Sequence, residues 1–569
     1  MIFSLFAPTI DTVKLILDDK DIPMDKQSDG TFICSVDNIS DGDHRYKFQI
    51  SKKSWILSTS IDIIDPYTTK YDREKHTGII TIKDGKKYEE EFKWQYDHIK
   101  LPENNDLIFY ELYVADFSHN RQFSGVIDQL DYLSDLGMNG IELMPIMGIE
   151  EKEPDWGYLP CHFFCLKSSY GSINDLKLLV DKCHQRKIRV FLDGVFNHSD
   201  KKCSLALIDK DYWYYKGKHH PEDPFWWGPE FNYEFEDKQL NIKPAYYKGK
   251  HHPEDPFWWG PEFNYEFEDK QLNIKPAVKF MSDVVKYWIG EFHLDGIRFD
   301  AAKQMDNYDI LGHLDSVARS VRRSQPFFSQ AEYILERKDL LKENGGPVDA
   351  CWSTSFHEGL RGALALVKER MDTLGNLGTL KYSFSSKNFV NYLSNHDNER
   401  LLFDIGKKDS DAFTRMKTAI ILLFTSVGIP MIRQGEELGE DRKLGNYQVQ
   451  RTCFPMPWDL LKEDFNIRLF NTFKHLIKLR HVNKSLREEP LNYFYEDNQN
   501  RIIAYSRGKN LVVIVSFNQM AQIKYIIGNF PQNGIWIDYI TNEQVSVDDV
   551  NNLTLDLLPF DSRLYIKQT

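Results

Sequence analysis

Three different patterns of apolar and polar positions follow one another along the chain. Residues 1–100 contain short strand-like runs, among them TVKLILDD, GTFICSVDN and HRYKFQISKK, separated by Asp-Gly turn signals. From residue 107 to residue 485, apolar runs alternate with amphipathic segments, which is typical of βα units around a parallel sheet. Residues 486–569 return to strands with IIAYSRG, LVVIVSFN and IKYIIG. The pattern predicts an N-terminal β-sandwich, a central α/β domain and a C-terminal β-sandwich.

The central region has the rhythm of a closed barrel. Its predicted strands are LIFYELYV, GIELMP, RVFLDGVFN, HLDGIRFD, FFSQAEY, DACWS, FVNYLSNHD and GIPMIRQG. Helices are predicted over residues 125–137, from Asn174 to residue 187, and over residues 277–292 with Pro276 just ahead of the last one. Eight such units predict a (β/α)₈ TIM barrel over residues 107–485.

A perfect tandem repeat interrupts this barrel between its third and fourth strands. The 32 residues 214–245 recur letter for letter as residues 246–277. A solenoid needs at least three stacking units, so the repeat indicates a recent duplication or an error in assembling the sequence. We expect the second copy, which adjoins the helix near Ala277, to pack in the barrel. The first copy would then be extruded, exposing Phe225 and Trp226, and could impair the protein.

The composition indicates which classes of binding partner and which cellular compartment to expect. The formal net charge of −14 disfavours nucleic acid and anionic membranes, because phosphate binding needs clustered Lys and Arg. The seven cysteines are scattered without a CxxC pair, which predicts free thiols in a reducing compartment. The start, MIFSLFAPTIDTVKLIL, lacks a basic region and a cleavage site, and no apolar run reaches the length of a membrane span. We expect a cytoplasmic protein, whose oligomeric state the sequence does not predict.

The chemistry should lie where the barrel strands end, because active sites of such barrels form at that face. Four predicted strands end in FLDGVFNHSD, GIRFDAAKQ, SQAEYI and YLSNHDNER. One strand-end Asp alone is more often a helix cap, but four such segments in this order resemble the signature regions of the α-amylase superfamily (glycoside hydrolase family 13). DWGYLPCHFF and PEFNYE are also similar to segments of that family. The resemblance covers residues 107–480 and extends to an immunoglobulin-like N-terminal module and a C-terminal β-sandwich.

The resemblance implies three catalytic carboxyl groups. Asp300 is the implied nucleophile, Glu332 the acid/base, and Asp397 the carboxylate that holds sugar hydroxyls and stabilises the transition state. Retaining cleavage needs two carboxyls about 5–5.5 Å apart. Arg298 lies two residues before Asp300 on one strand, so we expect it to lower the pKa of Asp300. Glu332 follows an apolar run without an adjacent basic residue, a setting expected to keep it protonated.

Other residues are implied as ligands of the sugar at the cleavage point. They are Tyr158, which would stack on the sugar, with His198, Arg298, His396 and Arg400 as polar contacts. Trp156 is as consistent with packing as with binding, and Asp193 is expected to organise its loop.

No metal or cofactor is assigned from the sequence. Many members of the family use the residue at the position of Asn197 to bind a structural calcium ion. Gln304 stands where calcium-dependent members commonly carry His, and this departure leaves calcium out of the expected site.

The expected function is retaining hydrolysis of α-1,4-glucosidic bonds in glucans or malto-oligosaccharides. Two alternatives share the same covalent intermediate: a branching-type transglycosylase and a trehalose-releasing hydrolase. A third alternative, from another class, is a glucan-binding protein whose activity the inserted copy has impaired.

Overall fold

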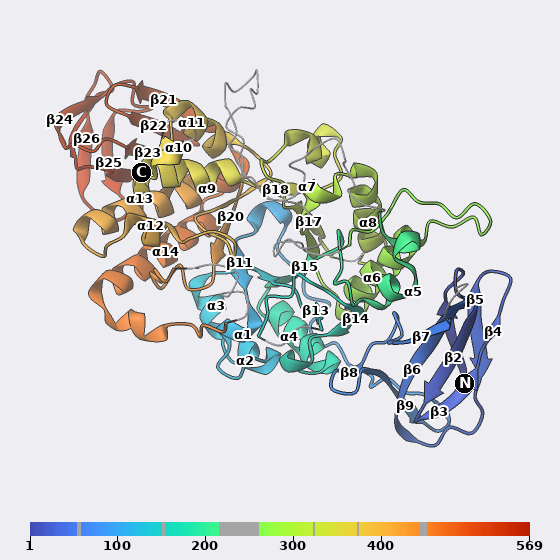
Figure 1. The fold of residues 1–569 in the computed structure, drawn as a ribbon. Coiled ribbons are helices and arrows are strands. Elements are labelled where there is room, and N and C mark those ends of the chain that lie inside the picture. Colours follow the sequence, from blue (N-terminus) through green and yellow to red (C-terminus); the bar gives the residue numbers. More distant parts are fainter. Residues whose placement is uncertain are drawn as a thin grey trace.

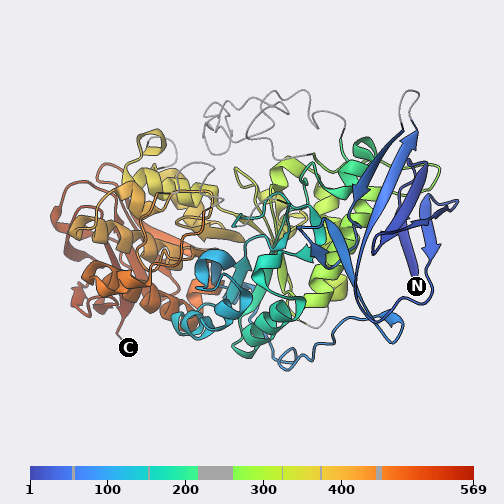
Figure 2. The same cartoon turned by 60° about the horizontal axis from the view of Figure 1, so that its bottom comes forward.

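The computed structural model describes residues 1–53, 58–150, 154–215, 261–322, 325–371, 375–443 and 452–568. Figures 1 and 2 show three parts in a row, with the N-terminal sheets and the C-terminal sheets at opposite ends of a central barrel. Among the described residues, every helix is too short or too polar to cross a bilayer.

The predicted barrel is confirmed, with eight parallel strands that close upon themselves. The first strand pairs with the last, through Phe109 and Met431 among other residues. In order around the barrel, the strands are β11 (Phe109–Leu112), β12 (Gly140–Leu143), β15 (Arg189–Gly194), β16 (Gly296–Phe299), β17 (Phe328–Ala331), β18 (Ala350–Trp352), β19 (Phe389–Tyr392) and β20 (Ile429–Arg433). Each predicted strand of this region contains one of them.

The barrel interior changes from apolar to charged along the strands. Phe109 and Phe191 point inward near the strand beginnings, where their ring centroids are 4.7 Å apart. Because side chains alternate along a strand, the residues two positions further on face the same interior. Those residues are Glu111 and Asp193, and Arg298 stands at the same height on β16; all three are buried. The barrel interior thus has an apolar layer near the strand beginnings and a buried layer of charged side chains above it.

The helices that surround the barrel follow the predicted apolar faces. The longer ones are α4 (Ile173–Gln185), α5 (Ser204–Trp213), α6 (Pro276–Phe292), α8 (Tyr308–Val321), α11 (Leu377–Ser385), α13 (Ser410–Thr425) and α14 (Asp464–Val482). Pro276 is the first residue of α6, where its missing N–H costs nothing. Helix α4 begins one residue earlier than predicted, because Ser172 and Asp175 form a capping box.

One predicted helix is divided in two. Residues 125–137 hold α2 (Phe123–Ile127) and α3 (Leu130–Leu136), with a break at Asp128 and Gln129. Gln129 takes φ −105° and ψ 5°, which lies outside the helical region. The apolar face continues across the break, since Val126, Leu130 and Leu133 are fully buried.

Antiparallel sheets form both ends of the chain. The N-terminal sheets contain β1 (Ile2–Phe6), β4 (Asp25–Lys26) and β5 (Thr31–Ser35) in one layer, and β2 (Thr12–Leu17), β3 (Lys20–Pro23), β6 (Gly42–Lys53), β7 (Ser58–Ile63), β8 (Tyr71–Asp72), β9 (Thr77–Lys83) and β10 (Lys86–Lys87) in the other. The C-terminal sheets contain β21 (Leu491–Asp497), β22 (Ile502–Arg507), β23 (Leu511–Ser516), β25 (Gly534–Asp538), β26 (Gln544–Val547) and β28 (Ser562–Lys567), with β24 (Gln522–Ile527) paired to β27 (Leu553–Leu557). The flanking β domains are therefore present as the sequence predicts.

The described part of the repeat joins the beginning of one copy to the end of the other. Tyr214 and Tyr215 belong to the first copy, and residues 261–277 belong to the second. The Tyr215 N–H donates to the Glu262 carbonyl at 2.9 Å, and the Tyr214 and Phe263 rings lie 4.5 Å apart. Residues 261–277 thus pack where we expected the second copy. The loop expected to be extruded, with Phe225 and Trp226, lies outside the described residues.

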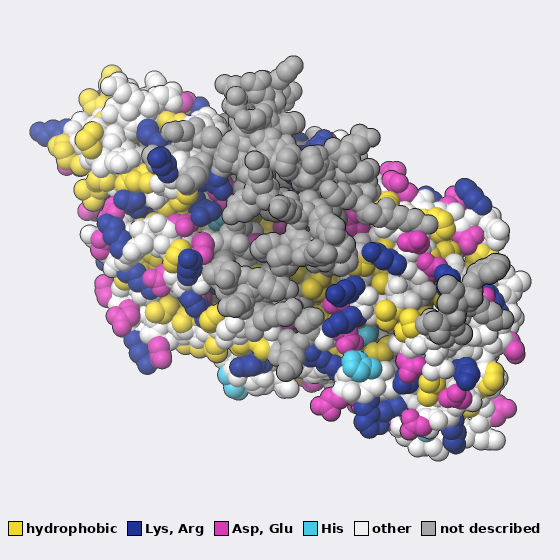
Figure 3. Space-filling view, viewed as in Figure 1, with side chains coloured by type: hydrophobic (Ala, Val, Ile, Leu, Met, Phe, Trp, Pro, Cys, Tyr) yellow, Lys and Arg dark blue, Asp and Glu magenta, His cyan; other side chains and the backbone are white. Residues whose placement is uncertain are grey.

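The described surface has a mixed charge on the face that Figure 3 shows. Acidic and basic side chains are interspersed there, with small apolar patches between them.

Deleting residues 214–245 should leave the fold intact. The remaining copy supplies the same residues to both junctions, because Tyr246 and Tyr247 then follow Trp213 in place of Tyr214 and Tyr215. We expect thermal unfolding of this variant to stay cooperative, with a midpoint equal to or above that of the full chain.

The matched control is Phe263→Ala in the full chain. It removes a fully buried ring and should lower the free energy of unfolding by about 3–5 kcal/mol. A deletion variant that unfolds as readily as Phe263→Ala would contradict the proposed packing.

Candidate active site

The strand-end residues named from the sequence converge at one mouth of the barrel. Asp193 lies on β15, Arg298 on β16, and Asp300 directly after β16. Glu332 follows β17, and the loop after β19 carries His396 and Asp397. Adjacent parallel strands bring these positions together, since Asp193 is the register partner of Arg298.

The guanidinium of Arg298 is the centre of the site. Its Nη1 donates to Asp193 Oδ1 at 2.5 Å and to Asp300 Oδ1 at 3.1 Å. Its Nη2 donates to Glu332 Oε2 at 2.7 Å. The Arg298 side chain is fully buried and stacks over the Trp352 ring at 4.1 Å. One planar cation therefore holds three carboxyl groups in fixed positions, which the fork geometry of Arg permits and a Lys ammonium does not.

The environment of Glu332 differs from the one expected from its sequence neighbours. No basic residue adjoins Glu332 in the sequence, but the structure pairs it with Arg298 from the next strand. The backbone N–H of Ala301 also donates to Glu332 Oε2 at 3.1 Å. The expected apolar setting is wrong, because strand pairing supplies contacts that local sequence does not reveal.

The expectation for Asp300 also needs correction. Burial raises the pKa of Asp300 well above its usual range, and the negative charges of Glu332, Asp193 and Asp397 raise it further. Arg298 lowers this pKa, as the sequence suggested, but does not outweigh burial. Three carboxyls around one guanidinium thus favour keeping a proton within the cluster.

The third carboxyl, Asp397, is the most exposed of the three. Its side chain is 50% exposed, against 10% for Asp300 and 15% for Glu332. Burial would raise the pKa of Asp397, but the neighbouring His396 and, less strongly, Arg298 lower it. Asp397 therefore presents an ionised carboxylate at the mouth of the site.

Tyr158 and the two histidines line one side of the site. Tyr158 donates its hydroxyl proton to Asp193 Oδ2 at 2.6 Å, and its ring stacks on His396 with centroids 4.8 Å apart. His396 Nδ1 lies 2.7 Å from Glu111 Oε1, and its Nε2 lies 3.3 Å from Asp397. Burial lowers the pKa of His396, but the charges of Asp397 and Glu111 outweigh it and raise the pKa well above normal.

His198 forms a hydrogen bond with the backbone of the loop that carries Tyr158. Its Nε2 lies 2.8 Å from the backbone carbonyl of Tyr158, and burial lowers the pKa of His198 to about 4. A neutral His198 in this position donates to the loop backbone. The contact observed here is therefore with the protein, beside the sugar contact that the resemblance implies.

Two other residues named from the sequence lie behind this layer. Arg400 is buried and donates to the Gln434 carbonyl at 2.6 Å and to Glu440 Oε2 at 2.7 Å. Trp156 is buried and meets the His396 ring edge-on at 5.4 Å. Both residues brace the loop of Asp397 in the described structure.

Several residues of the site were not singled out from the sequence. Glu111 orients His396, and Trp352 supports Arg298. Glu142 Oε1 lies 3.9 Å from Arg298 Nε, and Gln330 donates to Glu142. A polar residue inside an otherwise apolar strand, as in LIFYELYV or GIELMP, is the signal that would have identified the two glutamates.

A buried carboxyl group lies beside Asn197, the residue that the resemblance links to calcium in many family members. Asn197 is buried beside Glu262, which comes from the second copy of the repeat. Burial raises the pKa of Glu262 to about 9, although a hydrogen bond with Asn197 lowers it in part. No step below depends on a metal ion.

We expect the side chain of Arg298 to make a large contribution to the free energy of unfolding. Replacing it by Ala leaves three carboxyls without their cation, and we expect the free energy of unfolding to fall by about 3–5 kcal/mol. Arg298→Lys should lose less, because the charge remains while the fork is lost. Urea unfolding measures both.

Arg337→Ala is the matched control, since Arg337 forms an exposed ion pair with Asp339. Its loss should cost less than about 1 kcal/mol. Equal stability of Arg298→Ala and the control would contradict the central role of Arg298.

Comparison with known proteins agrees with this architecture. The model of the alpha amylase catalytic domain matches residues 67–342 and 363–464, and the model of carbohydrate-binding module 48 (isoamylase N-terminal domain) matches residues 1–68. The chain is 28% identical over 475 residues to malto-oligosyltrehalose trehalohydrolase of Saccharolobus solfataricus, covering 77% of this chain and 73% of that one.

Two further comparisons give the range of similar proteins. The 1,4-alpha-glucan branching enzyme GlgB of Picrophilus torridus is 23% identical over 544 residues, which cover 86% of this chain and 66% of that one. A crystal structure of pullulanase from Anoxybacillus with maltotetraose superposes with a TM-score of 0.73 at 18% identity, covering all of this chain and 86% of that one. The structural match establishes the fold.

Proposed function

The chain belongs to the family of the α-amylase catalytic domain, a family of glycoside hydrolases, and we propose that it cleaves α-1,4-glucosidic bonds of glucans or malto-oligosaccharides with retention. The observation that carries the proposal is the shared guanidinium of Arg298, which holds Asp300 and Glu332 side by side at two neighbouring strand ends. Two adjacent carboxyl groups are what retaining cleavage requires.

The first step forms a covalent intermediate. A carboxylate oxygen of Asp300 attacks the anomeric carbon while Glu332 donates its proton to the glycosidic oxygen. The bond between that carbon and that oxygen breaks, and the leaving glucan departs with a new hydroxyl group. Asp397, ionised at the mouth of the site, stabilises the positive charge that develops on the sugar.

The second step returns both carboxyls to their starting states. Glu332, now a carboxylate, takes a proton from a water molecule, whose oxygen attacks the anomeric carbon. The bond to Asp300 breaks and Asp300 leaves as a carboxylate. This cycle needs one proton among the clustered carboxyls, which agrees with their sharing one cation. The first step requires that this proton be on Glu332 and that Asp300 be ionised when the glycosidic bond breaks.

The aromatic and basic residues around this pair are proposed to bind the sugar. Tyr158 would stack on the sugar ring, as in the expected site, and is held in place through Asp193 and His198. His396, whose pKa is raised well above normal by Asp397 and Glu111, would donate to a sugar hydroxyl. The N-terminal module, residues 1–68 of which match a carbohydrate-binding family, is proposed to hold the same glucan outside the barrel.

A second candidate is release of trehalose from a glucan that ends in trehalose. It is supported by the similarity to malto-oligosyltrehalose trehalohydrolase over 77% of this chain. The same intermediate serves a branching-type transfer, where a sugar hydroxyl replaces water. The acceptor distinguishes transfer from hydrolysis, and the released product distinguishes trehalose release from other hydrolysis, so product analysis separates the three reactions.

Asp300→Asn is the test of the proposed nucleophile. We expect turnover to fall by about four orders of magnitude or more, because the amide cannot form the intermediate. The variant should stay folded and be at least as stable as the parent, since one of three clustered carboxylates is lost. Activity near that of the parent would refute the assignment.

The reaction itself is followed with a linear α-1,4-glucan and with one that carries a terminal trehalose. Rising reducing ends with shorter chains support hydrolysis, and free trehalose supports the second candidate. Redistributed chains at constant reducing ends indicate transfer. Binding without turnover, relieved by deleting residues 214–245, would show impairment by the repeat; inertness of both forms would reject catalysis.

A further inference from the structure

A mixed cluster of ligand-type side chains lies at the base of the loop that carries Tyr158. This loop connects β13 (Met147–Gly148) to β14 (His162–Leu166), which pair antiparallel. Glu150 stands at its beginning, and Cys161 and His162 stand at its end. The Cys161 N–H donates to the Gly148 carbonyl at 2.9 Å, which closes the base.

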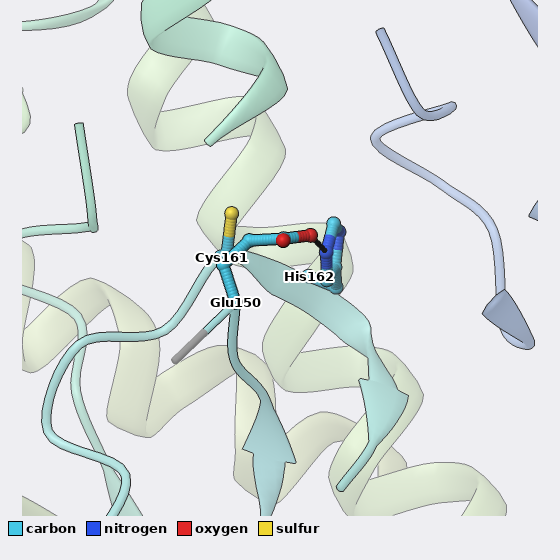
Figure 4. Close-up of side chains that lie close together, drawn as sticks. All are labelled: Glu150, Cys161 and His162. Carbon is cyan, nitrogen blue, oxygen red and sulfur yellow. Dashed lines mark hydrogen bonds and ion pairs between the residues drawn. The ribbon is translucent and has the colours of Figure 1, made fainter. Parts of the chain in front are cut away.

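The ligand atoms of the three side chains lie near one another at the base of the loop. One ligand atom from each of Glu150, Cys161 and His162 lies within 4.8 Å of the other two. Glu150 Oε1 and His162 Nε2 are 2.7 Å apart, and Figure 4 shows the Cys161 thiol beside this pair. All three side chains are buried or nearly so, with Glu150 9% and His162 5% exposed.

A further imidazole, that of the exposed His76 on the N-terminal sheets, lies at the edge of this group and contacts Glu150. His76, in the turn between β8 and β9, has its Nδ1 3.6 Å from Glu150 Oε2. The same turn region is fixed to the loop base by two further contacts. Tyr71 donates to the Ile149 carbonyl at 3.1 Å, and Arg73 donates to the Glu150 carbonyl at 3.0 Å.

We propose that Glu150, Cys161 and His162, with His76 as the fourth ligand, form a binding site for one thiophilic divalent transition-metal ion, of which Zn²⁺ is the type. Thiolate, imidazole and carboxylate are the ligands that Zn²⁺ takes in proteins, and four of them complete its tetrahedron. The ligand set differs from the oxygen-rich shell that calcium requires.

Binding of the metal ion replaces an existing hydrogen bond by bonds from the ligands to the ion. The ion replaces the thiol proton of Cys161, which passes to solvent, and inserts between Glu150 and His162 in place of their hydrogen bond. The proton on Nε2 of His162 is lost to solvent while Nδ1 takes up a proton, and Nε2 then offers its lone pair to the ion. Glu150 and Cys161 lie eleven positions apart on the two sides of the loop, so the ion would clamp the loop base and join it to the N-terminal sheets.

We expect the bound metal ion to restrict the motion of residues 158–161 of this loop. Tyr158 lies three residues before Cys161, and its backbone carbonyl accepts from His198. A clamp at residues 150 and 161 restrains this stretch, independently of the reaction that the site catalyses. Metal binding can therefore be tested without an activity assay.

The test is a cobalt titration of the full chain after removal of metals with a chelator, under reducing conditions. We expect one equivalent of Co²⁺ to bind with a near-ultraviolet charge-transfer band from thiolate to metal, and Zn²⁺ to displace it. X-ray absorption of the zinc form should show one sulfur neighbour at about 2.3 Å and nitrogen or oxygen neighbours at about 2.0–2.2 Å.

Two variants and a control assign the ligands. Cys161→Ser should abolish the band and weaken Zn²⁺ binding by at least about 100-fold, and His162→Gln should weaken binding while keeping the thiolate band. Cys34→Ser, which alters another buried thiol on β5, should bind as the parent does. Absence of the band in the parent, or its persistence in Cys161→Ser, would overturn the proposal.

Discussion

The bridging guanidinium of Arg298 is the interaction on which the rest of the site depends. Its three bonds to Asp193, Asp300 and Glu332 join β15, β16 and β17 at the depth where the apolar interior ends. Burying a cation at such a place is costly unless charged partners surround it, and here three carboxyls do. The same arrangement leaves more acids than cations in the centre, which suits a cluster that must retain one exchangeable proton.

Around this centre, Tyr158 and His396, which are proposed to bind the sugar, are each held by a residue from another barrel strand. Asp193 on β15 holds the hydroxyl of Tyr158, and Glu111 on β11 holds the imidazole of His396. The loop of Tyr158 has a further support outside the barrel. Residues of β8 and of the turn that follows it donate hydrogen bonds to the backbone at the base of this loop. The barrel interior thus sets the orientation of the site residues, and the N-terminal sheets fix the base of the loop of Tyr158.

The two copies of the tandem repeat are identical, so their connections along the chain decide which copy packs in the barrel. Either copy has the residues to pack beside Asn197, but only the second runs directly into α6 through Lys275 and Pro276. The first copy is joined to α5 through Trp213, and its Tyr214 packs on Phe263 of the second. The described structure therefore contains one packing unit built from the two outer ends of the duplication.

The sequence by itself determined the architecture and the acid residues that stand at the strand ends. Strand runs such as GIELMP and RVFLDGVFN predict the barrel because buried parallel strands must be apolar, and polar strand ends mark the active face. Helix boundaries were less certain, as the break at Gln129 shows. Only the tertiary structure decided the electrostatics: that Glu332 is bound to Arg298, that burial outweighs Arg298 at Asp300, and that Asp397 and Glu111 raise the pKa of His396. These contacts join residues on different strands, and desolvation depends on everything packed around a group, so neither can be read from local sequence.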